Sequence, residues 1–563
     1  MCYIVAIFKC EVLHYNTVIP SGVIIFKYLV TSALTYVNNI PHLGTVTPLV
    51  SADAYVRFLR LRGEDVVFVS GSDDYGTPTT VQAQIEGVTP QELVEKYSKL
   101  QKEIFIDGFC IKFDKYSNTS VPEHIPIVQD IYRKIKKNGF VYQKEIEQLY
   151  CKKCRRFLPD RYVEGLCPHC GESGARGDQC DACGKLIDPL ELKDPYCVTC
   201  KGKPVVKKSE HIFFALSKLQ RDLEKWIKGN KHWLSQVRNF ALGWIKEGLH
   251  DRCISRDLEW GVPVPDLPGK VFYVWFDAVL GYVTACKQIG KQALWQDKDV
   301  RIVHFLGKDN VAFHAVFLPA IFKAAGSYKL AWQIPSNEYI NYEGGKFSKS
   351  KNRGIFADQA LKIYPADYWR YYLLANRPEK HDTDFTWKDF QEKINSDLND
   401  DIGNFVHRVL TLNKKFFECK VPDAKLADKD KKMLGKVKTT AEDISTALYA
   451  FELRKALHKT VEIARLGNEY LSAEEPWKKE NEKRRGIVIY ACLQICKALG
   501  VYLEPFIPLT ADRIKAMLCL PPLKWDQALE PLQAGIELKA PLPLFKKIED
   551  AEIAVHEKKF AGK

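Results

Sequence analysis

The sequence predicts an α/β core that carries a metal-binding insertion and is followed by an α-helical domain. Three observations support this fold class. Apolar, β-branched runs alternate with stretches of helical spacing early in the chain, which is typical of a parallel sheet covered by helices. Four Cys-x-x-Cys pairs lie within residues 151–200. From about residue 390 onward the apolar spacing is helical, with proline-rich breaks near 505–508 and 521–522.

The first strand and helix enclose a candidate phosphate site. A buried strand is expected over 23–30 and a helix over 47–61, so Pro41-His-Leu-Gly44 lies where the strand gives way to the helix. Phosphates bind at such turns because free backbone N–H groups and the helix dipole point there. His42 can donate a hydrogen bond to a phosphate oxygen, and Gly44 lets a ligand approach the backbone. By itself this tetrapeptide also fits an ordinary polar turn.

The second expected strand, residues 65–70, leads into an acidic turn that contains Asp73. A carboxylate at the carboxyl end of a parallel strand faces the ligand crevice of the sheet. The alternative is a turn aspartate, which is the commonest role of Asp-Asp beside glycine. Helices are expected to follow over 90–107 and 124–138.

The cysteine pairs are the most specific local pattern. Each pair offers two thiolates from one turn, and two pairs complete a tetrahedral Cys₄ site, so eight ligands predict two zinc ions. Such closed sites are structural, and they allow a small insertion with little core to fold. The spacing leaves open which pairs share an ion. The pairs are Cys151/Cys154, Cys167/Cys170, Cys180/Cys183 and Cys197/Cys200.

The chain then returns to the sheet. A strand is expected over 210–216 and a helix over 217–229, and the apolar run 271–282 is expected to rejoin the sheet. The strand 300–306 ends in another strand-to-helix turn at the same edge. Arg256, which lies between the expected helix 217–229 and the run 271–282, could reach a triphosphate or form a surface ion pair.

Length and composition bound the remaining possibilities. With 563 residues the chain is expected to form roughly three to four domains. Its formal net charge of +13 favours an acidic partner such as nucleic acid. No stretch of 18 or more apolar residues lacks charges, so no membrane span is predicted. The nine cysteines outside the pairs are typical of core thiols in a reducing compartment, and we expect a cytoplasmic protein.

A second glycine-led segment, Gly344-Gly-Lys-Phe-Ser-Lys-Ser-Lys351, supplies closely spaced lysines. With the segment that ends in His-Leu-Gly-Thr45, it resembles the two signatures of class I aminoacyl-tRNA synthetases, usually written HIGH and KMSKS. The flanking residues are similar to methionyl-tRNA synthetases of the archaeal and eukaryotic cytosolic type. The resemblance extends from about Tyr28 to Ile548. It implies a Rossmann-like catalytic domain, a zinc-knuckle insertion and an α-helical anticodon-binding domain.

The resemblance implies a division of the chain into consecutive parts. Residues 1–22 do not match the family and are expected to pack poorly as an N-terminal extension. The remaining parts are the first half of the catalytic domain (23–138), the connective insertion (139–270), the second half (271–335), a lysine-loop and stem-contact region (336–392), the anticodon-binding domain (393–540) and a C-terminal tail (541–563).

The activity implied by the resemblance is that of a methionine–tRNA ligase. Methionine and ATP would form methionyl-adenylate and pyrophosphate, and the methionyl group would pass to the 3′ end of tRNA(Met). Such chemistry needs fixed positive charge and hydrogen-bond donors more than a covalent nucleophile. The matching catalytic positions are His42, Thr45, Lys346 and Lys349, and Mg²⁺ is expected with ATP.

Matching positions also imply the binding sites. ATP would contact His42, Gly44, Asp309, Lys346, Ser348 and Lys349, with Asp309 on the ribose. Methionine would contact Leu34, Tyr36, Asp73, Trp275, Ala278, Tyr282, Phe313 and His314; Asp73 would hold its amino group, and the Tyr282 hydroxyl could meet its sulfur. The anticodon would be read by Asn404, Arg408 and Trp477, since planar groups suit unstacked bases. Trp477 could equally be a core tryptophan. The family also suggests that the inner cysteine pairs share one zinc and the outer pairs the other.

Three positions depart from the family pattern. Thr35 stands where proline is frequent, Val279 stands where proline or threonine is usual, and Thr45 replaces the final histidine of the first signature. We expect activity to survive these changes, because threonine can still donate a hydrogen bond.

Other functions are less consistent with the sequence. The insertion is too small for the editing domain that isoleucyl, valyl and leucyl enzymes require. A cysteinyl enzyme would place zinc in its active site. A zinc-knuckle RNA-binding scaffold would not need His42, Asp73, Lys346 and Lys349. We expect a monomer, with a multisynthetase assembly or a tRNA-binding protein as a candidate partner.

Overall fold

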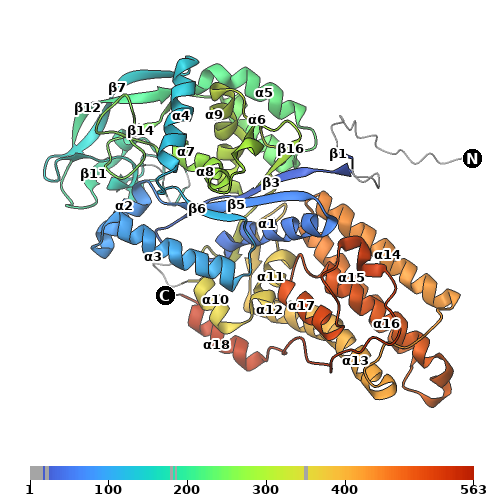
Figure 1. The fold of residues 1–563 in the computed structure, drawn as a ribbon. Helices are drawn as coiled ribbons and strands as arrows, with labels where there is room; N and C mark the ends of the chain where they lie inside the picture. Colours follow the sequence, from blue (N-terminus) through green and yellow to red (C-terminus); the bar gives the residue numbers. More distant parts are fainter. Residues whose placement is uncertain are drawn as a thin grey trace, which may run out of the picture.

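The computed structural model describes residues 17–18, 24–177, 180, 182–183, 185, 187–347 and 353–562. The predicted N-terminal extension lies outside these residues except for β1 (Thr17–Val18), which pairs with β2 (Ile24–Ile25). Ser348 and Lys349 also lie outside them. Figure 1 shows an α/β part beside a group of long helices, so the predicted fold class is confirmed.

A six-stranded parallel sheet forms the centre of the α/β part. Its order is β17–β16–β3–β5–β4, and β6 also pairs with β5. The strands are β3 (Lys27–Ser32), β4 (Thr35–Tyr36), β5 (Asp65–Asp73), β6 (Lys115–Asn118), β16 (Val300–Gly307) and β17 (Ser336–Asn337).

Helices cover both faces of this sheet because both faces are apolar (Figure 1). On one face Leu29 and Ile302 pack with α4 (His124–Lys137), α8 (Gly281–Gln288) and α9 (Leu318–Ala325). On the other, Val30 and Phe68 pack against α1 (Leu43–Arg62). Neighbouring residues of β3, Leu29 and Val30, therefore pack into different apolar cores. After β5 the chain forms α2 (Thr77–Glu86) and α3 (Pro90–Lys102), which pack together around a small core of their own.

Two predicted boundaries differ from the structure. The first central strand begins at Lys27 rather than residue 23, because Ile24–Ile25 pair with β1 instead of the sheet. Helix α1 begins at Leu43, four residues before the predicted start, because the His42 side chain caps it.

The prediction that residues 271–282 rejoin the sheet was wrong. Only β15 (Val271–Phe272) is extended, and it pairs with β14 (Ser255–Arg256) outside the central sheet. The chain then forms α7 (Val274–Asp277) and α8. A continuous apolar run satisfies a buried helix as well as a buried strand, so its periodicity could not separate them.

The insertion is built on the long antiparallel pair β7 (Val141–Cys151) and β12 (Val205–Phe214). The cysteine pairs lie at the far end of these strands, in a lobe with its own small core. Besides β7 and β12, the insertion contains β8 (Arg156–Phe157), β9 (Val163–Leu166), β10 (Ala175–Arg176), β11 (Lys193–Cys197), α5 (Gln220–Gly229), α6 (Ser235–Glu247) and β13 (Arg252–Cys253).

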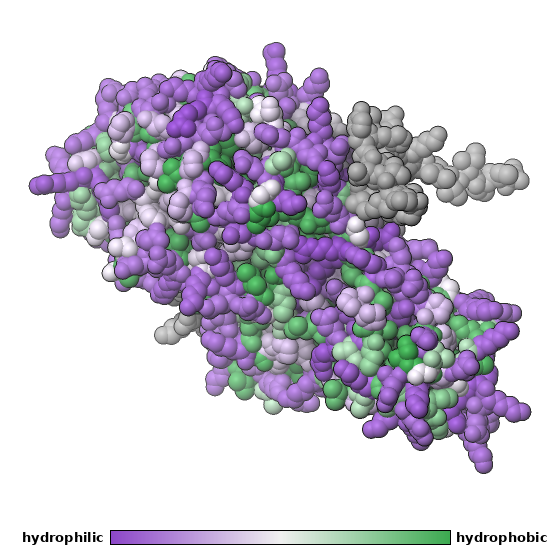
Figure 2. Space-filling model, viewed as in Figure 1, coloured by the Kyte–Doolittle hydropathy of each residue, from purple (hydrophilic) through white to green (hydrophobic). Residues whose placement is uncertain are grey.

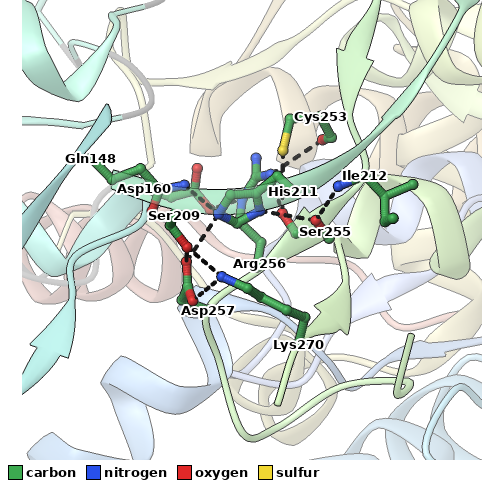
Figure 3. Close-up of polar contacts among 10 residues, drawn as sticks. All are labelled: Gln148, Asp160, Ser209, His211, Ile212, Cys253, Ser255, Arg256, Asp257 and Lys270. Carbon is green, nitrogen blue, oxygen red and sulfur yellow. Dashed lines mark hydrogen bonds and ion pairs between the residues drawn. The ribbon is translucent and has the colours of Figure 1, made fainter. Parts of the chain in front are cut away.

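A buried polar network joins β12 to the last part of the insertion, residues 255–270 (Figure 3). His211 on β12 lies 2.9 Å from the Ser255 hydroxyl and 3.0 Å from Asp257. Lys270 donates to Asp257 and to Ser209. Although burial favours the neutral imidazole, the hydrogen bond to Asp257 raises the pKa of His211. The network fixes the base of the insertion through paired charges.

The rest of the chain is largely helical. Two helices, α10 (Ala357–Ile363) and α11 (Ala366–Ala375), lie between the parallel strands β18 (Ile340–Tyr342) and β19 (Thr383–Phe385). The helices after β19 are α12 (Trp387–Lys393), α13 (Asn404–Phe417), α14 (Asp428–Tyr449), α15 (Leu453–Glu474), α16 (Glu482–Tyr502), α17 (Pro508–Met517) and α18 (Asp550–Phe560). Among the described residues one helix, Lys479–Tyr502, is long and apolar enough to cross a bilayer, but 83% of its apolar window is buried inside the protein. It is therefore the core helix of this group.

Arg370 on α11 ties the helical group to the α/β part. Its guanidinium, fully buried, donates to the carbonyls of Phe506, Pro505 and Phe109 and pairs with Asp53 of α1 at 2.7 Å. One continuous apolar core runs through both parts. The exposed face in Figure 2 is mostly hydrophilic over both parts.

Candidate active site and metal clusters

A cavity of about 700 Å³ opens at the carboxyl ends of the parallel strands. Residues that follow β3, end β5 and β16, or follow β17 all contribute to its wall. Every described residue predicted to bind ATP or methionine lines it, as does Thr45. These residues are Leu34, Tyr36, His42, Gly44, Thr45, Asp73, Trp275, Ala278, Tyr282, Asp309, Phe313, His314 and Lys346. The fold thus brings together segments that lie about three hundred residues apart.

His42 occupies the N-cap position of α1. Its Nδ1 accepts the backbone N–H of Gly44 at 3.1 Å, which leaves the proton on Nε2. Burial lowers the pKa of His42 to about 4, so the ring is neutral at pH 7. A Cβ on Gly44 would lie 2.9 Å from the His42 ring, so only glycine fits beneath it. The site offers an N–H donor and a helix N-terminus to an anion.

The two signature segments meet at this ring. Phe347, which follows Lys346 in the lysine segment, stacks on His42 with ring centroids 4.9 Å apart. The next segment returns to the same place, because the Ala357 N–H donates to the Pro41 carbonyl at 2.9 Å. Lys346 therefore lines the same cavity as the cap of α1.

Asp73 is a buried carboxylate that lacks a partner on one oxygen. It is 6% exposed, and its Oδ1 has no hydrogen bond. Burial, reinforced by the negative charges of Asp277 and Asp74, raises the pKa of Asp73 well above its ordinary value. Such a group gains most from a cationic ligand, because a bound ammonium would supply both the missing donor and the missing charge.

Asp277 lies behind Asp73 without lining the cavity. It is fully buried, neither of its carboxylate oxygens has a hydrogen bond, and His124 Nε2 lies 3.9 Å away. Burial raises the pKa of Asp277 and lowers that of His124 to about 3. Asp277 thus adds to the electrostatic cost of ionising Asp73.

Aromatic rings form the adjoining wall. Trp275 and Phe313 meet edge to face, with centroids 4.5 Å apart. His314 Nδ1 donates to the Asn310 carbonyl, so its Nε2 accepts the Tyr282 hydroxyl at 2.8 Å. Burial lowers the pKa of His314 to about 4, so this wall is uncharged at pH 7. The Tyr282 hydroxyl donates its proton to His314, so this wall presents mainly ring faces to a ligand.

Several lining residues were not anticipated. Tyr339 donates to Asp309, and Glu338 pairs with Lys308 at 2.8 Å. Gln101 donates to the Tyr36 carbonyl and accepts from Thr35, both at 2.7 Å. A signal for Gln101 existed, because it lies on the same helix face as the apolar Leu93 and Tyr97. No comparable pattern marked Tyr339 or Glu338.

Arg256 does not line the cavity. Its Nε donates to Asp160 at 3.1 Å (Figure 3). Its guanidinium lies 3.6 Å from the centre of the Tyr273 ring. Although burial opposes the charge, Asp160 raises the pKa of Arg256. Of the two alternatives for this residue, the structure has the ion pair, partly buried at the base of the insertion.

The eight paired cysteines form two clusters, and in each one all four sulfurs lie within 4.8 Å of one another. The outer pairs, Cys151/Cys154 and Cys197/Cys200, share one cluster, and the inner pairs, Cys167/Cys170 and Cys180/Cys183, share the other. Sulfur–sulfur distances between the pairs of each cluster are 3.4–3.8 Å. A tetrahedron of thiolates about 2.3 Å from a central zinc has edges of about 3.8 Å, so both clusters fit a metal ion. The geometry thus agrees with the nested arrangement.

A separate rim lies on the helical domain. Asn404 and Arg408 are one turn apart on α13, and the Arg408 guanidinium lies 5.5 Å from the centre of the Trp477 ring. Trp477 is 38% exposed, so it is a surface residue rather than a core tryptophan. The structure therefore brings all three predicted anticodon residues to one exposed edge.

Comparisons with known proteins agree with these two regions. Residues 28–410 match the family described as tRNA synthetases class I (M), and residues 421–563 match the anticodon binding domain of methionyl tRNA ligase. The methionine–tRNA ligase of Aeropyrum pernix is 43% identical over 544 residues, which are 93% of this chain and 95% of that protein. That of Methanocaldococcus jannaschii is 43% identical over 539 residues, which are 95% and 81% of the two proteins. The solved Mycobacterium tuberculosis methionyl-tRNA synthetase in complex with methionyl-adenylate has a TM-score of 0.79 and 25% identity, covering 92% of this chain and 100% of that one.

Proposed function

Because this chain belongs to the methionyl-tRNA synthetase family of class I and joins methionine to tRNA through methionyl-adenylate, we propose that the cavity at the strand ends is where adenylation takes place. The observation that carries this proposal is the meeting of His42, Phe347 and Lys346 beside the unpartnered carboxylate of Asp73. The wall formed by His42 and Lys346 suits a triphosphate, and the wall that contains Asp73 suits an amino acid.

Methionine would bind with its ammonium on Asp73 and its thioether against the aromatic wall. Trp275, Phe313 and Tyr282 offer polarizable ring faces, which suit sulfur better than charged groups would. The neutral His314 keeps that wall uncharged. Asp309 is placed to meet the ribose hydroxyls, once Tyr339 releases it.

In the first step a methionine carboxylate oxygen forms a bond to the α-phosphorus of ATP. The bond from that phosphorus to the bridging oxygen breaks, and pyrophosphate leaves with the electron pair. His42 Nε2–H, Lys346 and the proposed Lys349 would stabilise the charge on the phosphates, and Mg²⁺ would arrive on the triphosphate. In the second step a ribose hydroxyl of tRNA attacks the carbonyl carbon and AMP leaves.

Pyrophosphate exchange with each amino acid tests this proposal. Exchange should require methionine, ATP and Mg²⁺, and tRNA should accept label only from methionine. Exchange driven equally by several amino acids would contradict the methionine assignment, and exchange with none would contradict the catalytic assignment.

We assign zinc to both cysteine clusters, as structural ions. Cys197→Ser should halve the zinc content measured by mass spectrometry, and Cys183→Ser should halve it through the other cluster, because each variant removes one ligand of one ion. Cys519→Ser, which changes an exposed thiol outside both clusters, is the matched control and should leave two ions per chain. Loss of both ions from either single variant would contradict two separate sites.

The helical rim around Asn404, Arg408 and Trp477 is proposed to read the anticodon of tRNA(Met). Trp477→Ala should raise the KM for tRNA by about tenfold or more, since one base stacked on an aromatic ring contributes about 1–3 kcal/mol. Exchange should be unchanged, because that reaction needs no tRNA. Trp477→Phe keeps an aromatic face and should retain most of the affinity. Equal losses in aminoacylation and in exchange would rule out this role.

The remaining assignments follow from the same identification. We propose that 23–138 and 271–335 are two halves of one catalytic domain, that 139–270 is the insertion, and that 393–540 is the anticodon-binding domain, preceded by 336–392 and followed by 541–563. We also propose a cytoplasmic monomer, whose basic net charge supports tRNA binding. Sedimentation with and without tRNA would test the monomer.

A further inference from the structure

We propose that Arg485 is a positioning residue for tRNA recognition, which acts by holding the turn that presents Trp477; the inference rests on the proposed anticodon role of Trp477. This turn, residues 475–481, connects α15 to α16 and is called the Trp477 turn below. Arg485 lies in the first part of α16, and its side chain is only 12% exposed.

Arg485 binds the carbonyls on both sides of the indole. Its Nε donates to the Pro476 carbonyl at 2.7 Å, and its Nη2 donates to the Lys478 carbonyl at 3.3 Å. A planar guanidinium offers these donors in a fixed geometry, so the two carbonyls are held relative to each other. Trp477, between them, has its backbone direction set by one side chain.

The start of the turn is held in the same way. Asn481 Nδ2 donates to the carbonyls of Glu474 and Glu475, both at 3.1 Å. Glu475 adopts a left-handed conformation with φ of 40°, which is costly for a residue with a side chain. A turn that contains such a residue persists only where its surroundings determine it, and here side chains bind three of its carbonyl oxygens and that of Glu474 just before it.

Arg485 also connects this turn to the other recognition residues. Its guanidinium lies 4.0 Å from the centre of the Phe416 ring, on α13. The same helix carries Asn404 and Arg408, and Arg408 faces the Trp477 ring. Arg485 therefore fixes the turn against the helix that supplies the other two predicted contacts.

The expected consequence is pre-organisation. If the indole is ordered before tRNA arrives, binding does not have to order it, and ordering one side chain costs about 0.5–1.5 kcal/mol. The bonds of Arg485 are made to backbone carbonyls, so the residue need not touch tRNA itself. Arg408 and Trp477 would contact the tRNA, and Arg485 would hold the Trp477 turn in position.

Arg485→Ala should raise the KM for tRNA by up to about tenfold, with exchange unchanged. Arg485→Lys keeps the charge but cannot supply the two-pronged geometry, so its KM should fall between those of the parent and the alanine variant. Arg513→Ala is the matched control, because Arg513 also caps two carbonyls, those of Leu544 and Pro543, in another part of the helical domain. Its KM for tRNA should not change, even if its thermal stability falls as much.

A double-mutant cycle separates positioning from other roles. If Arg485 acts through Trp477, the variant that lacks both should have the same KM for tRNA as Trp477→Ala alone. Additive losses would overturn the inference and indicate that Arg485 contacts tRNA directly. For a tRNA with an altered anticodon, the KM should differ little between the parent and Arg485→Ala.

Different results would contradict the anticodon role of Trp477 and the positioning role of Arg485. If Trp477→Ala leaves the KM for tRNA unchanged, the proposed anticodon role is wrong. If Trp477→Ala raises that KM while Arg485→Ala and Arg485→Lys do not, the anticodon role stands and the positioning inference is wrong.

Discussion

Asp73→Asn should raise the KM for methionine by roughly two to three orders of magnitude while kcat changes little. Removing one partner of a buried charge pair costs about 2–5 kcal/mol, and the ammonium is held equally before and during the reaction. Asparagine has nearly the same shape, so the loss measures charge rather than packing. Pyrophosphate exchange at increasing methionine concentration gives both constants.

The same substitution should stabilise the fold. Burial and neighbouring acids raise the pKa of Asp73, so the folded chain retains a proton that the unfolded chain has lost. Stability therefore falls as pH rises from the ordinary aspartate value to the raised one. Asp73→Asn removes this loss, and its thermal midpoint should exceed that of the parent at neutral pH. A lower midpoint would mean that the carboxylate stabilises the empty protein.

Methionine affinity should depend on pH in the opposite direction and rise with pH. Only ionised Asp73 attracts the ammonium, so below the pKa of Asp73 in the free enzyme the affinity should fall about tenfold per pH unit. Asp277→Asn removes a neighbouring charge without touching the cavity wall, so it should shift this profile to lower pH. An unshifted profile would exclude Asp277 as a source of the raised pKa.

Lys349→Ala should slow adenylate formation by several orders of magnitude, with methionine binding near normal. One transition-state donor is typically worth about 10²–10³ in kcat, and an ammonium on the departing pyrophosphate contributes a full charge as well. Lys349 is proposed from its motif, and its neighbour Lys346 lines the cavity. Single-turnover formation of methionyl-adenylate is the direct measurement.

Lys362→Ala is the matched control for that variant. The Lys362 side chain is 78% exposed, and its ion pair among the described residues is with Asp358 on its own helix, at 3.7 Å. Its removal should leave adenylate formation unchanged. Near-normal adenylate formation in Lys349→Ala would remove Lys349 from the mechanism.

Much of the candidate site could be predicted from residue spacing and motifs, because strand ends and cysteine pairs are local features of the sequence. Asp73 was placed correctly at the end of a strand since its run is short and β-branched. The nested sharing of the cysteine pairs came from the family resemblance, because their spacing alone allows other pairings.

Other features depend on packing that no local pattern contains. Residues 274–282 are helical and lie outside the central sheet, and apolar content alone cannot separate a buried helix from a buried strand. The stacking of Phe347 on His42 joins residues far apart in sequence. The neutrality of His42 likewise follows from burial and from the tautomer set by Gly44.

The buried guanidinium of Arg370 bears on how the enzyme selects its tRNA. It bonds at once to the α/β part, through Phe109 and Asp53, and to the helical group, through Pro505 and Phe506. Rotating one part against the other would break several of these bonds inside a shared core. These contacts hold the distance from the cavity to the Trp477 rim, and we expect the enzyme to favour a tRNA whose 3′ end and anticodon can reach both regions at once.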